Sequence, residues 1–228
     1  MRKTAVGSLL VLLLGAGSCT SGNGDGDEDG TEATAGEQTT CEQLLGASGV
    51  DWVKNSTKDK TGVATDSETL KSARSLFYSY AKAWSPKSSE IPMFTNSELC
   101  RVLKTAGASG NKNLSIHYGA SIVPFHEKSG ASEAGTATAV NADVKLVHKT
   151  ARNGTAKYYV YIKCRVSGAP EGQENEVPIE GVMNDTLTGD TDTRTHMKYL
   201  LHSAGVVARS FDCKNNPTVP ADPPTAVK

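Results

Sequence analysis

The feature that most constrains the fold is a change of hydrophobic period along the chain. Apolar residues recur every three or four positions in residues 66–85 and again in 190–211, which predicts two amphipathic helices. Between them, residues 114–122, 140–146 and 158–166 alternate apolar and polar side chains, which predicts strands with one buried face. Helices segregated at both ends of a run of strands favour an α+β fold with an antiparallel sheet of about four strands.

Two further helices are expected before the sheet. Thr40 and Gln43 have the spacing of a capping box, and Gly46 is expected to end a helix of one or two turns. A polar loop is expected over residues 54–66. Residues 95–98, Thr-Asn-Ser-Glu, have the spacing of a second capping box, and the helix that they begin is expected to end at Gly107.

The hairpin between the second and third strands has a register that the loop length decides. Asn153-Gly154 is a strong turn signal. A two-residue loop would place the two apolar sets on opposite faces of the sheet. A three-residue loop at 152–154 pairs Leu146 with Val160 and places both sets on one face, so we favour it.

The C-terminal third is expected to contain a strand, a long helix and a tail. A fourth strand is expected around Pro178, which places it at an edge of the sheet. A helix of about 18–20 residues should begin among the N-cap residues at 190–193 and run through Gly205, because its apolar stripe stays in phase. The domain is expected to span 41–213, with a Pro-rich, extended tail at 214–228 outside the core.

Residues 20–40 differ sharply from the domain in composition. They carry six acidic residues, no Lys or Arg, and no aromatic or branched apolar residue, so we expect a flexible tether. Residues 25–30 imitate the start of an EF-hand loop, but Gly36 stands where the bidentate Glu should be, so we expect no specific calcium site. Residues 41–228 have only a small basic excess, far from that of a nucleic-acid-binding protein.

Residues 1–19 have the pattern of an export leader. Arg2 and Lys3 precede about ten mostly apolar residues, too few for a bilayer span. Residues 16–19, Ala-Gly-Ser-Cys, resemble the lipobox of bacterial lipoproteins. The resemblance implies that residues 1–18 are a signal peptide and that an acylated Cys19 anchors the chain to the outer face of the cell membrane. An ordinary signal peptide cut after Ser18 fits the same residues. In layout the chain resembles uncharacterised lipoproteins of actinobacterial envelopes.

The five cysteines favour the lipid interpretation, because an odd number leaves one without a partner in an exported chain. If Cys19 is acylated, four remain. Cys41 and Cys100 both belong to the N-terminal part that is predicted helical. Cys164 points to the sheet face that a helix should cover, and Cys213 ends that helix. We therefore expect the disulfides Cys41–Cys100 and Cys164–Cys213.

Motifs for catalysis are weak. Ser79 and Lys82 match Ser-x-x-Lys, and residues 60–62 match Lys-Thr-Gly, both of which occur in penicillin-binding proteins and β-lactamases. Here their order is reversed and Ser79 lies deep in a predicted helix, so we interpret both as chance. The histidines are His117, His126, His148, His196 and His202. They lack ligand spacing, so we expect no metal and no cofactor. A cell-envelope hydrolase whose site forms only in three dimensions is the alternative function.

One surface of the third strand has a composition that suggests ligand binding. Cations alternate with aromatic residues at Lys157, Tyr159, Tyr161, Lys163 and Arg165. Candidates for the same face on neighbouring strands are Lys145, Lys149 and His117. Such a surface suits anionic glycans or wall polymers, through charge pairing and ring stacking. An ordinary solvated face, or one covered by a helix, fits the same pattern. We expect an extracytoplasmic binding or envelope-associated module.

Overall fold

The computed structural model describes residues 38–58, 61–63, 68–87, 93–104, 112–127, 135–150 and 155–227, with the backbone alone for 61–63. The predicted leader, the lipidation site Cys19, the tether to residue 37 and the hairpin loop at 152–154 lie outside the described residues.

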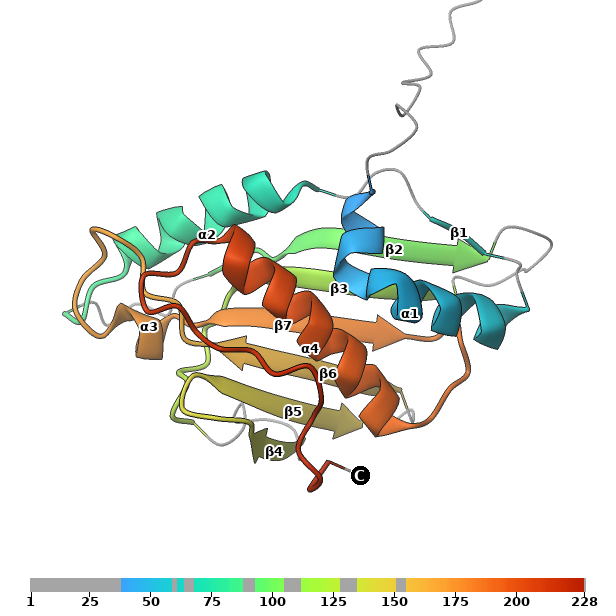
Figure 1. The fold of residues 1–228 in the computed structure, drawn as a ribbon. Helices are drawn as coiled ribbons and strands as arrows, with labels where there is room; N and C mark the ends of the chain where they lie inside the picture. Colours follow the sequence, from blue (N-terminus) through green and yellow to red (C-terminus); the bar gives the residue numbers. More distant parts are fainter. Residues whose placement is uncertain are drawn as a thin grey trace, which may run out of the picture. The chain divides into compact units, whose positions relative to one another are not determined.

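The fold is α+β, with a single antiparallel sheet at its centre (Figure 1). The strands are β1 Thr61–Val63, β2 Ser97–Lys104, β3 Asn113–Ala120, β4 Gly135–Ala139, β5 Val144–Thr150, β6 Ala156–Ile162 and β7 Ile179–Asp185. Within the described residues their spatial order is β1-β2-β3-β7-β6-β5-β4. This confirms the predicted fold class, but the sheet has seven strands rather than about four.

Helices pack on one face of this sheet. They are α1 Thr40–Thr57, α2 Leu70–Ala83 and α4 Thr193–Ser210, while the short α3 Gln173–Glu176 lies in the connection between β6 and β7. In Figure 1, α4 crosses in front of β6 and β7, and α1 lies beside it. The predicted helix at 66–85 is confirmed as α2. The long C-terminal helix is confirmed as α4, with Asp192 as its N-cap and Gly205 in its interior.

The core lies between the sheet and the helices α1, α2 and α4. Gly181 on β7 is required there, because a Cβ at that position would lie 2.4 Å from Cε1 of Tyr118. The Tyr118 hydroxyl reaches past it to the Ser203 hydroxyl of α4, at 2.6 Å. A residue without a side chain therefore lets the tyrosine ring cross from the sheet to the helix.

Residues 95–107 were expected to form a helix, and this prediction is wrong. Residues 97–104 form β2, which pairs with β3. A bulge between Glu98 and Cys100 lets Leu99 and Cys100 both be buried. The local capping-box spacing is overridden by the ladder to β3 and by the disulfide from Cys100, since short-range signals are weak against tertiary pairing.

The first helix is longer than expected. Its capping box is formed by Thr39 and Glu42 rather than by Thr40 and Gln43. Gly46 does interrupt the helix, with φ 65°, but a second helical segment follows and reaches Thr57. The two segments meet at a kink because the left-handed conformation of glycine turns the chain without ending it.

The register of the second hairpin is confirmed. Leu146 lies opposite Val160, and Tyr158, Val160 and Ile162 are buried on the helix-covered face. The strand that was expected at 140–146 begins later, at Val144, because residues 141–143 form a turn. A further strand, β4, lies just before it at Gly135–Ala139.

The fourth predicted strand is β7, but its expected place at an edge is wrong. β7 pairs with both β3 and β6 and is therefore central. Pro178 does not prevent this, because it precedes Ile179, the first paired residue, so that no ladder hydrogen bond needs its missing N–H. Its carbonyl accepts a hydrogen bond from the Ser121 amide at 2.9 Å.

The C-terminal segment was expected to lie outside the core, and the structure corrects this. Val227 is only 7 % exposed and belongs to the core cluster. The Arg194 guanidinium donates hydrogen bonds of 3.0 Å to the carbonyls of Pro223 and Pro224. Prolines cannot donate from their backbone, but their carbonyls remain strong acceptors, and Arg194 on α4 uses them to hold the segment.

The disulfides join the residues predicted from the sequence. Cys41 bonds Cys100, with Cα atoms 4.5 Å apart, and Cys164 bonds Cys213, with Cα atoms 4.9 Å apart. The first ties α1 to β2. The second joins Cys164, which follows β6, to Cys213, which follows α4. The contacting helices α1 and α4 are therefore each linked to the sheet by a disulfide.

Candidate ligand-binding surface on the sheet

The face of the sheet opposite the helices carries most of the predicted ligand residues. Side chains alternate along a strand, so Lys145 and Lys149 on β5 and Lys157, Tyr159 and Tyr161 on β6 all point away from the helix-covered face. Lys149 lies opposite Lys157, and Lys145 lies opposite Tyr161. Strand alternation thus brings together the cations and rings that the sequence indicated.

One part of this face is accessible. Lys157 is exposed, and Lys149, Tyr159 and Lys163 are partly exposed. We call these four residues the cationic surface. The Lys149 ammonium lies 5.2 Å from the centre of the Tyr159 ring, within cation–π range. Within the described residues none of the three lysines forms a salt bridge, although Lys149 interacts electrostatically with Glu180 and the Lys163 ammonium lies 4.8 Å from the centre of the Phe125 ring.

The neighbouring part of the face is closed by residues 121–127. Lys145 is only 8 % exposed and donates hydrogen bonds to the carbonyls of Phe125 at 2.9 Å and Glu127 at 2.5 Å. Its ammonium also lies 4.7 Å from the centre of the Tyr161 ring, which is 2 % exposed. Burial lowers the pKa of Lys145. Lys145 and Tyr161 therefore hold a loop on the sheet and do not form an accessible part of the predicted face.

A buried carboxylate lies beneath that loop. Glu180 on β7 accepts hydrogen bonds from the Asn96 amide at 3.1 Å and the Ser121 hydroxyl at 3.3 Å, and it also bonds the Tyr161 hydroxyl. Burial raises the pKa of Glu180 despite these bonds. Burial, together with the Glu180 charge, raises the pKa of Tyr161 as well. This network joins the loop and β6 to the central strand.

Two other predicted residues lie away from the cationic surface. Arg165 follows β6 and pairs with Glu174 of α3 at 2.7 Å. His117 on β3 lies 3.5 Å from the Glu98 carboxylate, and burial lowers the pKa of its imidazole. Neither residue contributes a free charge to the surface.

The matches to catalytic motifs do not assemble a site in the described residues. Ser79 on α2 donates its hydroxyl hydrogen bond to the Leu76 carbonyl of its own helix, at 2.7 Å. Lys82 lies 5.9 Å from the ring centre of Tyr78. In the described part of the chain no hydrogen bond joins the Ser79 and Lys82 side chains, so Ser79 has no activating base there.

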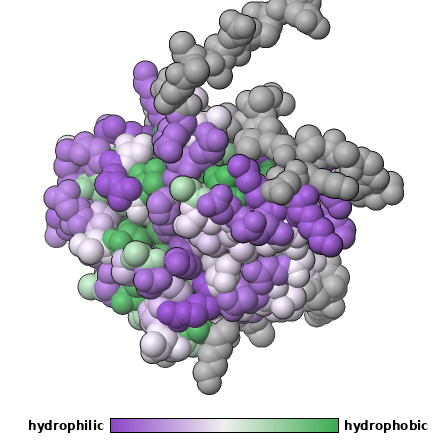
Figure 2. Space-filling model, turned by 45° about the vertical axis from the view of Figure 1, so that its right-hand side comes forward, coloured by the Kyte–Doolittle hydropathy of each residue, from purple (hydrophilic) through white to green (hydrophobic). Residues whose placement is uncertain are grey.

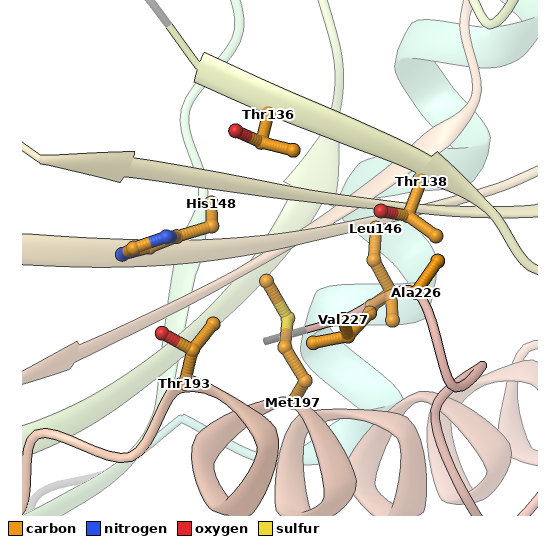
Figure 3. A pocket seen from close by; sticks show the side chains of 8 residues that line it. All are labelled: Thr136, Thr138, Leu146, His148, Thr193, Met197, Ala226 and Val227. Carbon is orange, nitrogen blue, oxygen red and sulfur yellow. The ribbon is translucent and has the colours of Figure 1, made fainter.

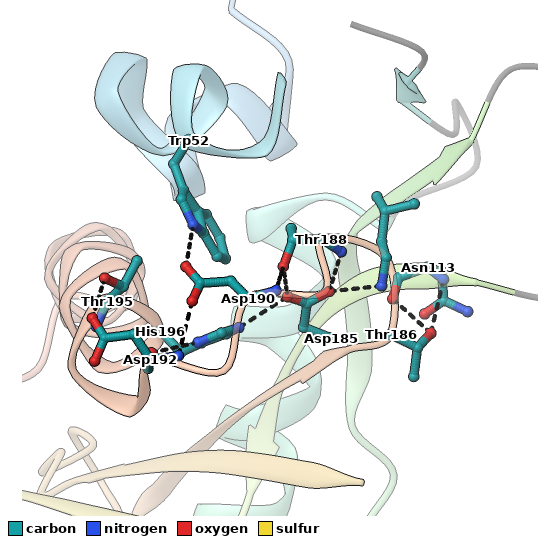
Figure 4. Close-up of polar contacts among 10 residues, drawn as sticks. Trp52, Asn113, Asp185, Thr186, Thr188, Asp190, Asp192, Thr195 and His196 are labelled. Carbon is teal, nitrogen blue, oxygen red and sulfur yellow. Dashed lines mark hydrogen bonds and ion pairs between the residues drawn. The ribbon is translucent and has the colours of Figure 1, made fainter. Parts of the chain in front are cut away.

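A histidine and an aspartate form a buried pair that the sequence did not indicate (Figure 4). Nε2 of His196 lies 2.9 Å from Oδ2 of Asp185, and Nδ1 lies 2.8 Å from the Asp192 carbonyl oxygen. Both partners are acceptors, so both ring nitrogens carry protons. Burial alone would lower the pKa of His196, but these hydrogen bonds raise it above its ordinary value.

This pair does not form part of a nucleophile–base arrangement. A histidine that acts as general base needs one unprotonated nitrogen facing the nucleophile, whereas both nitrogens of His196 are occupied by acceptors. The side chain is 1 % exposed, which also keeps substrate from it. The pair is an internal ion pair between the start of α4 and the end of β7.

Two kinds of feature are absent from the described residues. No cluster of three His, Cys, Asp or Glu side chains there has a geometry that could hold a metal ion. None of the described helices has the length and apolar character of a membrane span. The side of the molecule drawn in Figure 2 is mostly hydrophilic, with apolar residues in small separate patches.

Comparison with known proteins found no match for this chain among protein-family models, curated proteins or solved structures.

Proposed function

We propose that the chain is a lipid-anchored extracytoplasmic binding module, and that its cationic surface binds an anionic glycan or wall polymer of the cell envelope. The observation that carries this proposal is the position of Lys149 directly opposite Lys157, with the Tyr159 ring beside them. The anchor and the compartment rest on the leader at residues 1–19, as argued from the sequence.

The arrangement favours a polymer over a small anion. Directly opposed residues of an antiparallel pair have Cβ atoms about 5 Å apart, so the two lysines place positive charge on one small area of the sheet. A ligand with regularly repeated negative charges can pair with several such cations at once. A partly exposed aromatic ring beside the cations adds a surface on which a sugar ring can stack.

The surface also suits the proposed location. A flexible segment of the length of 20–40 has an end-to-end distance of roughly 25 Å, which lets a domain reach polymer close to the membrane. Each exposed charge pair contributes little by itself, about 0.2–1 kcal/mol, so binding should be weak at a single point and depend on many contacts.

We expect neutralisation of the cationic surface to reduce binding about tenfold or more at low salt, since it removes three charge pairs. The variant is Lys149→Gln with Lys157→Gln and Lys163→Gln. Binding is measured by co-sedimentation with purified cell wall and with soluble polygalacturonate, at low and high salt.

A matched control separates the surface from net charge. Lys71, Lys82 and Lys198 are exposed lysines on the helices, and their replacement by Gln removes the same total charge. This control should bind within about twofold of the wild type. Equal loss in both triple variants, or no retention of the wild type on either polymer, would contradict the proposal.

A further inference from the structure

A groove lies on the helix-covered side of the sheet, between the β4 edge and the first turn of α4. It consists of two adjoining hollows, of about 260 Å³ and 400 Å³, and both are lined by His148 and Thr193. We call their union the α4 groove. The larger hollow falls within the usual range of volumes for small-molecule sites, about 300–1,000 Å³, and the smaller one is slightly below it.

The first hollow combines hydroxyl groups with an apolar floor. In Figure 3, Thr136 and Thr138 of β4 project from one side, while Thr193 and Met197 of α4 project from the other. Thr136 lies opposite His148 and Thr138 opposite Leu146, so these side chains share one face of the sheet. A threonine hydroxyl both donates and accepts hydrogen bonds, which suits a ligand that carries many hydroxyls.

The orientation of His148 is fixed by a stack of rings. Its imidazole lies 5.2 Å from the Tyr158 ring, and the Tyr158 ring lies 4.4 Å from His196, with both interplanar angles at 9°. His196 is itself held by Asp185 and the Asp192 backbone. A polar group that is positioned before binding loses less entropy when the ligand arrives.

His148 lines both hollows, and its ring nitrogens have no hydrogen-bond partner among the described residues. Burial, together with the nearby positive charge of His196, lowers the pKa of His148. The neutral imidazole offers one N–H donor and one nitrogen acceptor. Both can bond a hydroxyl group of a ligand.

The charge of the groove disfavours anions. Among the described residues, no lysine or arginine lines either hollow. Two aspartates line the larger one, but Asp185 is paired with His196 and Asp190 accepts a hydrogen bond of 2.9 Å from the Trp52 indole. The described lining therefore offers no counter-charge for an acidic ligand, and its carboxylates are already engaged.

We propose that the α4 groove binds a neutral, hydroxyl-rich carbohydrate of about two sugar rings, one in each hollow. The C–H faces of the sugars lie on Leu146, Met197 and Val227, while the threonines and His148 bond their hydroxyls. This site is independent of the proposed function, because the cationic surface lies on the opposite face of the same strands.

The test is titration of the full chain with trehalose, maltose, cellobiose and diacetylchitobiose, and with digalacturonate as the charged counterpart. Saturation-transfer NMR detects contact and calorimetry gives the affinity. We expect at least one neutral disaccharide to bind with a Kd of about 1 mM or below.

Two substitutions locate the site. His148→Phe keeps a stacked ring but removes both nitrogens, and Thr138→Val keeps the shape but removes the hydroxyl. Each should weaken binding about tenfold, as expected when a ligand hydroxyl loses its partner. Lys71→Gln, at an exposed position on α2 outside the groove, should leave the affinity unchanged. Absence of saturable binding for all four neutral sugars, wild-type affinity in both variants, or binding of digalacturonate alone would overturn the proposal.

Discussion

Replacement of Asp185 by asparagine is expected to destabilise the domain by about 3–5 kcal/mol, the usual consequence of leaving a buried charge without its partner. His196 and Asp185 have side chains that are 1 % and 2 % exposed, so water cannot replace the lost carboxylate. Asp185 also accepts from the amides of Leu187 and Thr188, which shape the turn before α4. Urea denaturation of both proteins measures the difference.

The same pair predicts a pH dependence that the variant should lose. Burial alone would raise the pKa of Asp185, but hydrogen bonds from His196 and Thr188 hold it below its ordinary value. Its contribution to stability is therefore present above about pH 4 and is lost as the pH falls through the lowered pKa. The pKa of His196 is raised, so its contribution is complete below about pH 6.5 and is lost as the pH rises through the raised pKa.

Two controls distinguish a lost counter-charge from a general disturbance. Asp190→Asn removes a carboxylate that bonds the Trp52 indole and a backbone amide, and it should cost only about 1 kcal/mol. Asp185→Asn combined with His196→Gln removes both charges, and it should be less destabilised than Asp185→Asn alone. An Asp185→Asn protein as stable as the wild type, with the same pH profile, would show that His196 is not charged in the core.

Removal of the Cys164–Cys213 disulfide is expected to cost about 4 kcal/mol, from the chain entropy that a bond over 49 residues removes. The bond fixes the end of α4 beside the sheet. In Cys164→Ala with Cys213→Ala, hydrogen exchange should accelerate most in α4, because the end of that helix loses its covalent link to the sheet. Cys41→Ala with Cys100→Ala should accelerate exchange mainly in α1.

Peptide mapping without reduction tests the connectivity itself. We expect one linked peptide pair from the Cys41 and Cys100 segments and another from the Cys164 and Cys213 segments. A peptide that joins Cys100 to Cys164 would contradict both the pairing and the helix packing that it reflects.

Local hydrophobic periodicity was sufficient to predict the elements whose buried face can be read from their own residues. α2 and α4 have uninterrupted apolar stripes, and the pairing of Leu146 with Val160 follows from the parity of the buried side chains. β2 was not predictable in this way, because its capping-box spacing is a local signal and its pairing with β3 is not. The central place of β7 depends on two partners distant in sequence, so a nearby proline was a poor guide.

In the candidate sites too, features set by local sequence were predictable and features set by distant residues were not. The alternation along β6 predicted that Lys157 and Tyr159 share a face. The burial of Tyr161 on that face depends on the path of residues 121–127, which cover it, and this path has no signal in β6 itself. His196 and Asp185 are 11 residues apart in different elements, so their pairing has no local signature. One signal was present: Asp185 has the same parity on its strand as the buried Met183, which marks it as a polar residue that points inward.

The most direct test of an anchored, extracytoplasmic protein is fractionation of host cells that express the wild type or Cys19→Ala. We expect the wild type in the membrane fraction, released by detergent but not by high salt, because two acyl chains give stable anchoring. The variant should appear in the medium or in the soluble extracytoplasmic fraction. Release of the wild type as freely as the variant, or retention of both inside the cell, would contradict the lipid anchor and the envelope location.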